Sequence, residues 1–503
     1  MDISDYSTLI GRLEHEADRR PPLYRLKARF VAALGYAPVA VAGLGVLAAL
    51  GLLIVPLASG GHPAITSGVV FLVSVLVLLA FVRALWVSIE LPSGRYLDRE
   101  EVPALFAAID EITQKSAGRN SLPAVIDSVT LNREFTVALW QVPTRGVFGA
   151  CRNHLEIGVP MLAALSTAEL KTVLAHEIGH LGGAHDTFSA WIYRQRSVWM
   201  EVERKFSAAE GVVERVLAKF YSWYVPYFAA YTFVLAREHE YAADRAAARA
   251  TNSRVLGRAL IKADLMGRFL AEVFWKRLFE QVERLPEPPY LPYSVLPRVF
   301  SMAQKEWSRR DWLDQSLRTY PTHEETHPGL GERLTALEVT PELPTQVPDK
   351  SALALLGDNA TMLLKWCDDE WGNEYLSAWR KRHDALREVR WKIAQYAGTP
   401  EEQLKAEDLW EKSALLLDVG QELDAIQTLH LLVGRNDEKF AKAHLLLGRL
   451  LLEGGNEHGL ENLAEAAHQD PELVAEAGEL GYGYLIQRGR KGEAQRFWDR
   501  IRA

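Results

Sequence analysis

The most prominent feature of the hydrophobic pattern is an uncharged stretch near the N-terminus. From Phe30 to Val82 the chain contains no Asp, Glu, Lys or Arg. The turn-forming run Ser59-Gly60-Gly61-His62-Pro63 divides this stretch in two. The halves, about Phe30–Leu57 and Ile65–Val87, each exceed the roughly 20 residues that a membrane-spanning helix needs. We therefore predict a transmembrane hairpin over residues 30–88; a buried helical hairpin in a soluble core is the alternative.

Basic residues lie on both sides of this hairpin, and its loop contains no Lys or Arg. Arg83 lies near the end of the second half, and the residues before the first half are Arg19, Arg20, Arg25, Lys27 and Arg29. Because cytoplasmic loops are enriched in Lys and Arg, both ends of the hairpin are predicted to face the cytoplasm. We expect an integral membrane protein with two spans, a cytoplasmic N-terminal segment over residues 1–29, and a cytoplasmic catalytic domain after residue 88.

Residues 89–165 mix the periods of helices and strands. An amphipathic helix is predicted over Val102–Ser116. Short strands are predicted over Val125–Leu139 and Gly146–Gly158. This part of the chain therefore indicates an α+β fold that is mostly helical and has a small sheet.

A further helix is expected directly after these strands. The run Ser166-Thr167-Ala168-Glu169 matches a capping box, and apolar residues follow at helical spacing. Paired glycines at Gly182-Gly183 suit a helix C-terminus. The predicted helix begins near Thr167 and ends near this pair.

The C-terminal part of the chain has a different organisation. Prolines mark a linker over residues 340–349, and helical segments follow to about residue 405. In residues 406–503, Gly420, Gly455 and Gly489 recur about every 34 residues, the period of tetratricopeptide helix pairs. We predict tetratricopeptide-like helical repeats here; an irregular helical bundle is the alternative, since most consensus aromatic residues are missing.

Composition narrows the classes of function. Hydrophobic residues make up 48% and charged residues 24% of the chain, which is ordinary for a globular protein. The net charge of -8 argues against a nucleic-acid partner, because such proteins usually carry a basic face. The chain has only Cys151 and Cys367, so no disulfide framework is expected and a reducing compartment is favoured.

The residues with the clearest chemistry lie in the predicted helix after Ser166. They form the run His176-Glu177-Ile178-Gly179-His180. Histidines four residues apart share one helical face, so their imidazoles can converge on one cation. Glu177 lies beside them, where it can take a proton from the attacking water as a general base. The alternative, incidental histidines on a solvated helix, is disfavoured by the apolar run before the motif and by Gly179 within it.

Glu240 is a candidate for the third ligand. It lies four residues before Asp244 in an alanine-rich segment with strong helical propensity. Glu240 can complete a site of two histidines and one glutamate, and Asp244 can accept a hydrogen bond from the second ring nitrogen of a ligand histidine. Asp186 is the alternative ligand, because it follows His180 at metzincin spacing, but no methionine turn is evident. His185 and Asp186 are expected instead in a loop near the site.

Taken together, these motifs resemble the membrane zinc peptidase family that includes the CAAX prenyl endoprotease and the HtpX heat-shock protease. The resemblance rests on the runs Ala163–Leu170, Val173–His180 and Glu240–Asp244, and on Thr326-His327-Pro328 with Arg333. It covers roughly residues 100–340 and leaves out the C-terminal tail.

The resemblance implies a gluzincin-type metallopeptidase domain, which we place at residues 89–339. It implies one zinc ion per chain, with the ligands His176, His180 and Glu240 and the general base Glu177. It further implies that His327 or Arg333 lies near the site and stabilises the oxyanion. A structural contact at a helix start is the alternative for His327.

Phe220–Ala236 is a second uncharged segment and is rich in aromatic residues. A single membrane crossing here would put ligands of one zinc ion on opposite sides of the bilayer. We therefore predict a buried or interfacial helix, in contact with the membrane surface or forming a wall of the substrate groove.

The resulting hypothesis is a membrane-anchored zinc endopeptidase that acts on protein or peptide substrates. The substrate is expected to pair with an edge strand, for which Gly146–Gly158 is the candidate. The expected partners are the lipid bilayer and a protein bound to the C-terminal repeats. A membrane scaffold with a vestigial metal site is the alternative of another class. Lipidated C-termini and damaged membrane proteins both stay open as substrates.

Overall fold

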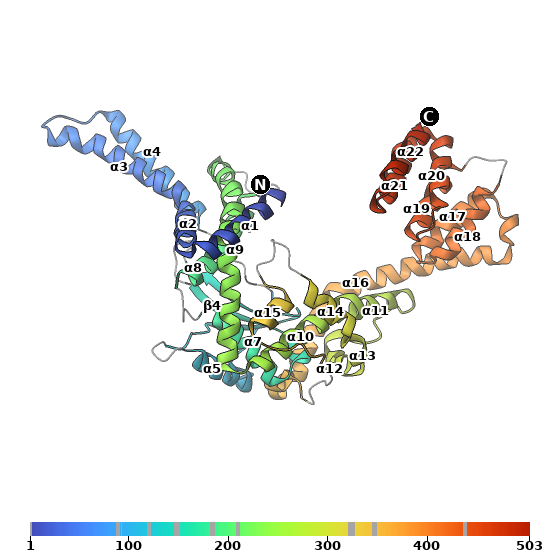
Figure 1. Ribbon diagram of the computed structural model, residues 1–503, viewed down its shortest axis with the longest axis horizontal. Coiled ribbons are helices and arrows are strands. Elements are labelled where there is room, and N and C mark those ends of the chain that lie inside the picture. Colours follow the sequence, from blue (N-terminus) through green and yellow to red (C-terminus); the bar gives the residue numbers. More distant parts are fainter. Residues whose placement is uncertain are drawn as a thin grey trace. The chain divides into compact units, whose positions relative to one another are not determined.

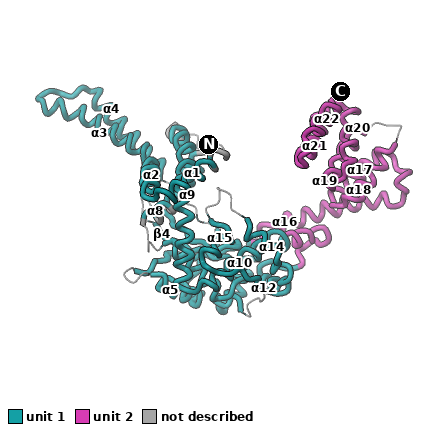
Figure 2. The backbone as a smooth tube through the Cα atoms, viewed as in Figure 1, with its two compact units in different colours: residues 1–275, 290–370 teal, residues 276–289, 371–503 magenta. Residues whose placement is uncertain are grey.

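The computed structural model describes residues 3–86, 91, 93–117, 122–144, 151–181, 187–207, 212–319, 327–344, 350–435 and 440–502. The chain forms two compact units (Figure 2). Unit 1 comprises residues 1–275 and 290–370, and unit 2 comprises residues 276–289 and 371–503. The described residues are mostly helical with one small sheet, which confirms the predicted α+β class.

Two long apolar helices form a hairpin near the N-terminus. Helix α3 spans Ala37–Ala58 and helix α4 spans Ile65–Ala84, and both are long and apolar enough to cross a membrane. Their side chains, such as Leu47 and Leu72, are largely exposed. A buried core hairpin would hide such residues, so the exposure favours a membrane protein.

The first apolar helix begins later than the uncharged stretch that predicted it. Residues 30–34 belong to a separate helix, α2 (Pro21–Leu34), and α3 begins only at Ala37. The reason is tertiary: α2 packs one face into unit 1 through Tyr24, Ala28 and Val31. Its end therefore belongs to the folded domain rather than to the hairpin.

Helix α2 joins a helical layer whose core is aromatic. The other members are α1 (Ile3–Arg19), α8 (Thr187–Ser207) and the long helix α9 (Val212–Ala250). Helix α9 contacts α1, α2, α7 and α8 (Figure 1). Phe220–Ala236 lies within α9, and its residues Tyr221, Tyr224 and Phe228 are buried. This segment is therefore largely a buried helix, although Trp223 is exposed.

The sheet has four strands among the described residues. They are β1 (Arg95–Tyr96), β2 (Ser128–Asn132), β3 (Val137–Pro143) and β4 (Cys151–Gly158), in the order β1-β2-β4-β3. The predicted strand over residues 125–139 is thus two strands. The backbone turns between them, where the Glu134 N–H donates to Asn132 Oδ1 over 3.1 Å.

The structure corrects the predicted edge strand. Strand β4 pairs with β2 on one side and with β3 on the other, so residues 151–158 are interior. Residues 154–158 are all buried, as two neighbours require. The described edge strand beside the helix that carries His176 and His180 is β3, and residues 145–150 of the earlier candidate lie outside the described residues.

Helix α7 (Thr167–Gly179) lies at the centre of unit 1. It begins with the predicted capping box between Ser166 and Glu169. Its neighbours are β3, α5 (Pro103–Ser116), α9 and α10 (Ser253–Phe269). Lys262 on α10 forms a buried ion pair with Glu169 over 2.9 Å, which holds the start of α7. The helix that carries the histidines is therefore fixed from several sides.

Further helices, short except for α16, complete unit 1 and lead into unit 2. They are α6 (Val159–Ala164), η1 (Leu270–Phe274), α11 (Trp275–Glu280), η2 (Gln281–Glu283), α12 (Pro292–Met302), α13 (Gln304–Trp307), α14 (Arg310–Arg318), α15 (Leu330–Ala336), η3 (Ala352–Asn359) and α16 (Ala360–Gln395). Helix α15 matters most for the site, because it carries Arg333.

The C-terminal part of unit 2 consists of three consecutive helix pairs. The pairs are α17 (Ala406–Asp418) with α18 (Glu422–Val433), α19 (Ala441–Glu453) with α20 (Gly459–Gln469), and α21 (Val474–Gln487) with α22 (Lys491–Arg502). Short 3₁₀ turns lie at η4 (Tyr396–Gly398), η5 (Glu401–Gln403) and η6 (Pro471–Leu473). Gly420, Gly455 and Gly489 follow the first helix of each pair with φ of 73°, 78° and 75°, a backbone region that favours glycine. The tetratricopeptide assignment itself stays a prediction.

Candidate metal centre and active site

Helices α7 and α9 bring His176, His180 and Glu240 together. Their potential ligand atoms all lie within 4.8 Å of one another, and all three side chains are buried. The two histidine Nε2 atoms are 3.3 Å apart. Glu240 Oε2 lies 3.5 Å from His176 Nε2, and Glu240 Oε1 lies 3.6 Å from His180 Nε2. The spacing of four residues on α7 therefore produces the convergence expected from the sequence.

A glycine in the motif allows the two helices to approach this closely. A Cβ atom on Gly179 would lie 3.1 Å from the Cα and 3.3 Å from the carbonyl oxygen of Ala243 on α9. Such contacts are tighter than normal packing and involve backbone, which cannot move aside easily. Gly179 and Ala243 thus set the distance between the helix with the histidines and the helix with Glu240.

The donor set fits a divalent metal ion. Two imidazole nitrogens and one carboxylate oxygen are the ligands that zinc and related transition metals prefer. Glu240 is fully buried, and its Oε1 has no hydrogen-bond donor among the described residues. A buried anionic oxygen without a donor is costly, and a bound cation would remove that cost. The three residues therefore form a group that could hold a metal ion.

Burial and mutual hydrogen bonds shift the ionisation of the cluster. Burial acts to lower the pKa of His176, but hydrogen bonds to Asp244 and Glu240 outweigh it and raise the pKa to about 9. Burial holds the pKa of His180 well below its usual value. Burial opposes ionisation of Glu240, yet the hydrogen bonds from His176 and His327 keep its pKa well below the usual range. The site thus favours a carboxylate that is ready to bind a cation.

Asp244 orients the first histidine from the side opposite the cluster. Its Oδ1 lies 2.8 Å from His176 Nδ1, which leaves Nε2 directed at Glu240. Arg333 donates to both oxygens of Asp244, over 2.6 Å from one terminal nitrogen and 2.9 Å from Nε. Burial acts to raise the pKa of Asp244, but these bonds outweigh it and lower the pKa to about 2. Arg333 therefore contacts the site through Asp244 and lies 3.4 Å from His176 Nδ1.

His327 approaches the cluster from a different element. Its Nδ1 lies 3.0 Å from Glu240 Oε2, although 63% of its side chain is exposed. It is thus in contact with a potential ligand on one side and open to solvent on the other. The hydrogen bond to Glu240 raises the pKa of His327.

Glu177 lies between the cluster and the edge of the sheet. Its Oε2 accepts a hydrogen bond over 3.1 Å from the backbone N–H of Leu139 on β3. Burial raises the pKa of the Glu177 carboxyl. The Leu139 N–H therefore points away from β4 and toward the site, along the outer edge of β3.

Several contacts around the site have no signal in the sequence. The Leu139 N–H is a backbone group, so no residue type announces it. The ring of His239 lies 5.0 Å from the ring of His180, and Arg237 is bonded to Glu332 over 2.5 Å, which joins α9 to α15. Arg237 and Glu332 are far apart in the chain, so their ion pair could have been predicted only by knowing that α9 packs near α15.

The alternative ligand cannot be placed. Asp186 and His185 lie outside the described residues, as does Thr326 of the resemblance. Glu240, by contrast, meets both histidines directly. The described geometry therefore completes a three-ligand cluster through Glu240.

A comparison with protein-family models supports the interpretation of this cluster. Residues 148–340 match the model of peptidase family M48, and the match contains His176, His180 and Glu240. No curated protein and no solved structure matches the chain significantly.

Proposed function

We propose that the chain is a membrane-anchored, zinc-dependent endopeptidase of peptidase family M48 that acts on protein or peptide substrates, because residues 148–340 match the model of that family. The observation that carries the proposal is the buried cluster of His176, His180 and Glu240 with Glu177 beside it. Zinc bound there would supply Lewis-acid chemistry, polarising the scissile carbonyl and acidifying a water molecule.

In this mechanism Glu177 is the general base. Its carboxylate takes a proton from the attacking water and passes it to the nitrogen of the leaving amine. The bond from Leu139 holds one carboxylate oxygen in place while the other is available for the proton. The raised pKa of Glu177 suits a group that must both accept and return a proton.

The remaining site residues are proposed to differ in role. His327 is open to solvent on one side and would donate a hydrogen bond to the carbonyl oxygen as it becomes negative. Arg333 has two hydrogen bonds to Asp244, so we propose that it positions His176 through Asp244 rather than touching the substrate.

We propose that the substrate chain pairs with the outer edge of β3. The N–H of Leu139 already points to that side, next to Glu177. Backbone pairing along an edge strand would align a peptide bond with the base without fixing the side chains of the substrate. This suits an enzyme that cleaves many sequences, whether damaged membrane proteins or processed termini.

The hairpin of α3 and α4 supports membrane anchoring, and the basic residues around it support a cytoplasmic catalytic domain. Cysteines introduced at Ser59, in the hairpin turn, and at Asn456, in unit 2, test the topology. We expect a membrane-impermeant reagent to label the two positions from opposite sides of the membrane. Labelling from one side only would contradict the spanning hairpin.

The helix pairs of unit 2 are proposed to bind a partner or substrate protein. The first helices of the pairs, α17, α19 and α21, share a pocket of about 240 Å³. Trp410, Leu445 and Leu480 supply apolar surface, and Lys442 and Arg449 supply positive charge. Such a surface would concentrate a substrate near the protease without taking part in catalysis.

The full-length Glu177→Gln variant tests the proposed activity. Because Glu177 is not a ligand, the variant should retain zinc, while hydrolysis of casein should fall by roughly 10²–10⁴-fold. Glu272→Gln, at an exposed ion pair, is the matched control and should keep full activity. Near wild-type turnover of Glu177→Gln would exclude this base. A wild-type protein that binds zinc and cleaves nothing would favour the scaffold alternative.

A further inference from the structure

Helix α2 has two apolar faces, and only one of them is covered by the protein. Tyr24, Ala28 and Val31 are buried against other helices of unit 1. On the opposite side Leu26 is 62% exposed and Phe30 is 71% exposed. Leu23, at 38%, precedes them at helical spacing, so the three side chains form one outward stripe.

Cations lie along this stripe. Lys27 and Arg29 are on either side of Phe30 on the helix surface, and Arg19 and Arg20 precede the helix. Lys27 is paired with Glu16 over 2.6 Å. Within the described ranges of unit 1, Arg19, Arg20 and Arg29 form no ion pair, although Arg29 also lies over the Phe188 ring. An apolar stripe flanked by cations is the pattern of a helix that lies on a membrane surface.

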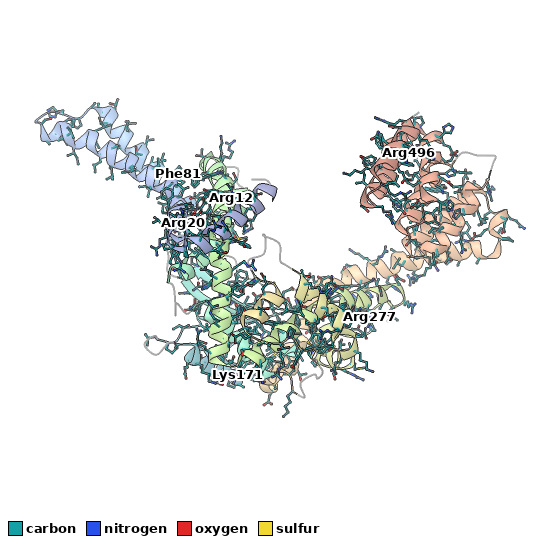
Figure 3. The ribbon with its side chains drawn as sticks, viewed as in Figure 1. Arg12, Arg20, Phe81, Lys171, Arg277 and Arg496 are labelled. Carbon is teal, nitrogen blue, oxygen red and sulfur yellow. The ribbon has the colours of Figure 1, made fainter. Side chains whose placement is uncertain are left out.

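The position of α2 places this stripe at the end of a candidate span. Helix α2 ends at Leu34, and the apolar helix α3 begins at Ala37. The second helix of the hairpin, α4, is also held by unit 1. Lys205 on α8 donates a hydrogen bond to the Ala84 carbonyl at the end of α4 over 2.9 Å. Trp86, just beyond α4, is 55% exposed, as is common for tryptophan at a membrane boundary. In Figure 3, Arg20 lies where α1 meets α2, and Phe81 lies near the end of α4.

We propose that α2 lies in the plane of the bilayer surface. Leu23, Leu26 and Phe30 would enter the boundary between headgroups and acyl chains. Arg19, Arg20 and Arg29 would contact lipid phosphates. This inference rests on the proposed membrane anchoring, and it adds a second, peripheral attachment that fixes the catalytic unit against the bilayer.

A second copy of the chain is a poorer occupant of this surface. Stable interfaces between proteins bury about 800 Å² on each partner, far more than three side chains on one helix can provide. Cations on both sides of the stripe would also face each other across a symmetric contact.

Single-cysteine variants of the full-length protein in phosphatidylcholine–phosphatidylglycerol nanodiscs test the proposal. Cys151 and Cys367 are first replaced by serine and alanine, and a fluorescent label is attached at one position at a time. The positions on the stripe are Leu26→Cys and Phe30→Cys. Leu47→Cys, in the middle of α3, reports the anchoring, and Leu423→Cys, an exposed leucine of unit 2, is the matched control.

Lipids with a nitroxide quencher high on the acyl chain then measure contact. We expect labels at residues 26 and 30 to lose roughly half of their fluorescence or more, and the label at 423 to lose little. Quenching at 47 without quenching at 26 and 30 would overturn the in-plane helix and leave the anchoring intact. No quenching at 47 would mean that the anchoring itself fails. Disulfide-linked dimers through Leu26→Cys, with no lipid quenching there, would assign the stripe to a second copy and also overturn the proposal.

Discussion

Replacing Asp244 with asparagine removes a buried charge without changing the shape of the side chain. The carboxylate accepts hydrogen bonds from Arg333 over 2.6 Å and 2.9 Å, and it lies 2.8 Å from His176 Nδ1. Asparagine keeps one oxygen acceptor. It cannot balance the guanidinium of Arg333, whose side chain is only 14% exposed.

Two effects set the expected loss of zinc affinity. Loss of a group that orients a ligand histidine typically lowers metal affinity 10–100-fold, or about 1.4–2.7 kcal/mol. The unbalanced guanidinium beside His176 also repels a dication, so we expect the loss to lie near 100-fold. The variant Asp244→Asn/Arg333→Gln removes both charges and should recover part of this loss, since neither group is then left unpaired.

The assay is competition for zinc with a chelator of known affinity, on purified full-length protein at constant pH. Asp311→Asn is the matched control, because Asp311 also pairs with an arginine, Arg309, but on the surface. It should bind zinc like the wild type. Thermal unfolding of the metal-free proteins checks that each variant folds.

An affinity of Asp244→Asn within about threefold of the wild type would refute the argument that this carboxylate orients His176. A double variant that binds zinc more weakly than Asp244→Asn alone would refute the second effect, because it would show that the unpaired Arg333 is not the source of the extra loss.

Three further predictions follow from the same helices and from the tail. Gly179→Val should lower the free energy of unfolding by about 1–3 kcal/mol and reduce zinc content, because the larger side chain pushes α7 away from Ala243. Denaturant unfolding measures this loss, and Gly11→Val is the control because there is open space around Gly11. Against the effect of burial, hydrogen bonds to Asp244 and Glu240 raise the pKa of metal-free His176 to about 9, so zinc must displace its proton. Zinc affinity should therefore rise about tenfold per pH unit from pH ~6 to ~8 and level off only above pH ~9; a flat profile in chelator competition would contradict the shift. Deleting residues 406–503 should leave cleavage of a short peptide nearly unchanged and reduce cleavage of a protein substrate; if the truncated protein unfolds or loses peptide hydrolysis, the tail is a structural part of the protease.

Local signals in the sequence were sufficient for several elements. The capping box at Ser166 predicted where α7 begins, and the histidines four residues apart predicted a shared face. The uncharged stretch predicted two long apolar helices, and the recurring glycines predicted the turns within the helix pairs. Each of these signals depends on residues close together in the chain.

Other features required the tertiary structure. The segment that forms β4 is the edge strand expected from the sequence, yet β2 and β3 both pair with it, and strand order cannot be read from one strand alone. Residues 30–34 look like part of a membrane span, but α2 packs against aromatic side chains of α9.

The features of the site also divide into those that the sequence predicted and those that depend on the tertiary structure. The sequence by itself determined which residues on α7 could bind a metal and where their helix starts, because helical spacing and capping act over a single turn. The contacts of Glu177 with Leu139, of His327 with Glu240 and of Arg333 with Asp244 were decided only by tertiary packing. They join residues from different elements, and their distances depend on how closely α7, α9, α15 and the edge of β3 can approach, which no local pattern encodes.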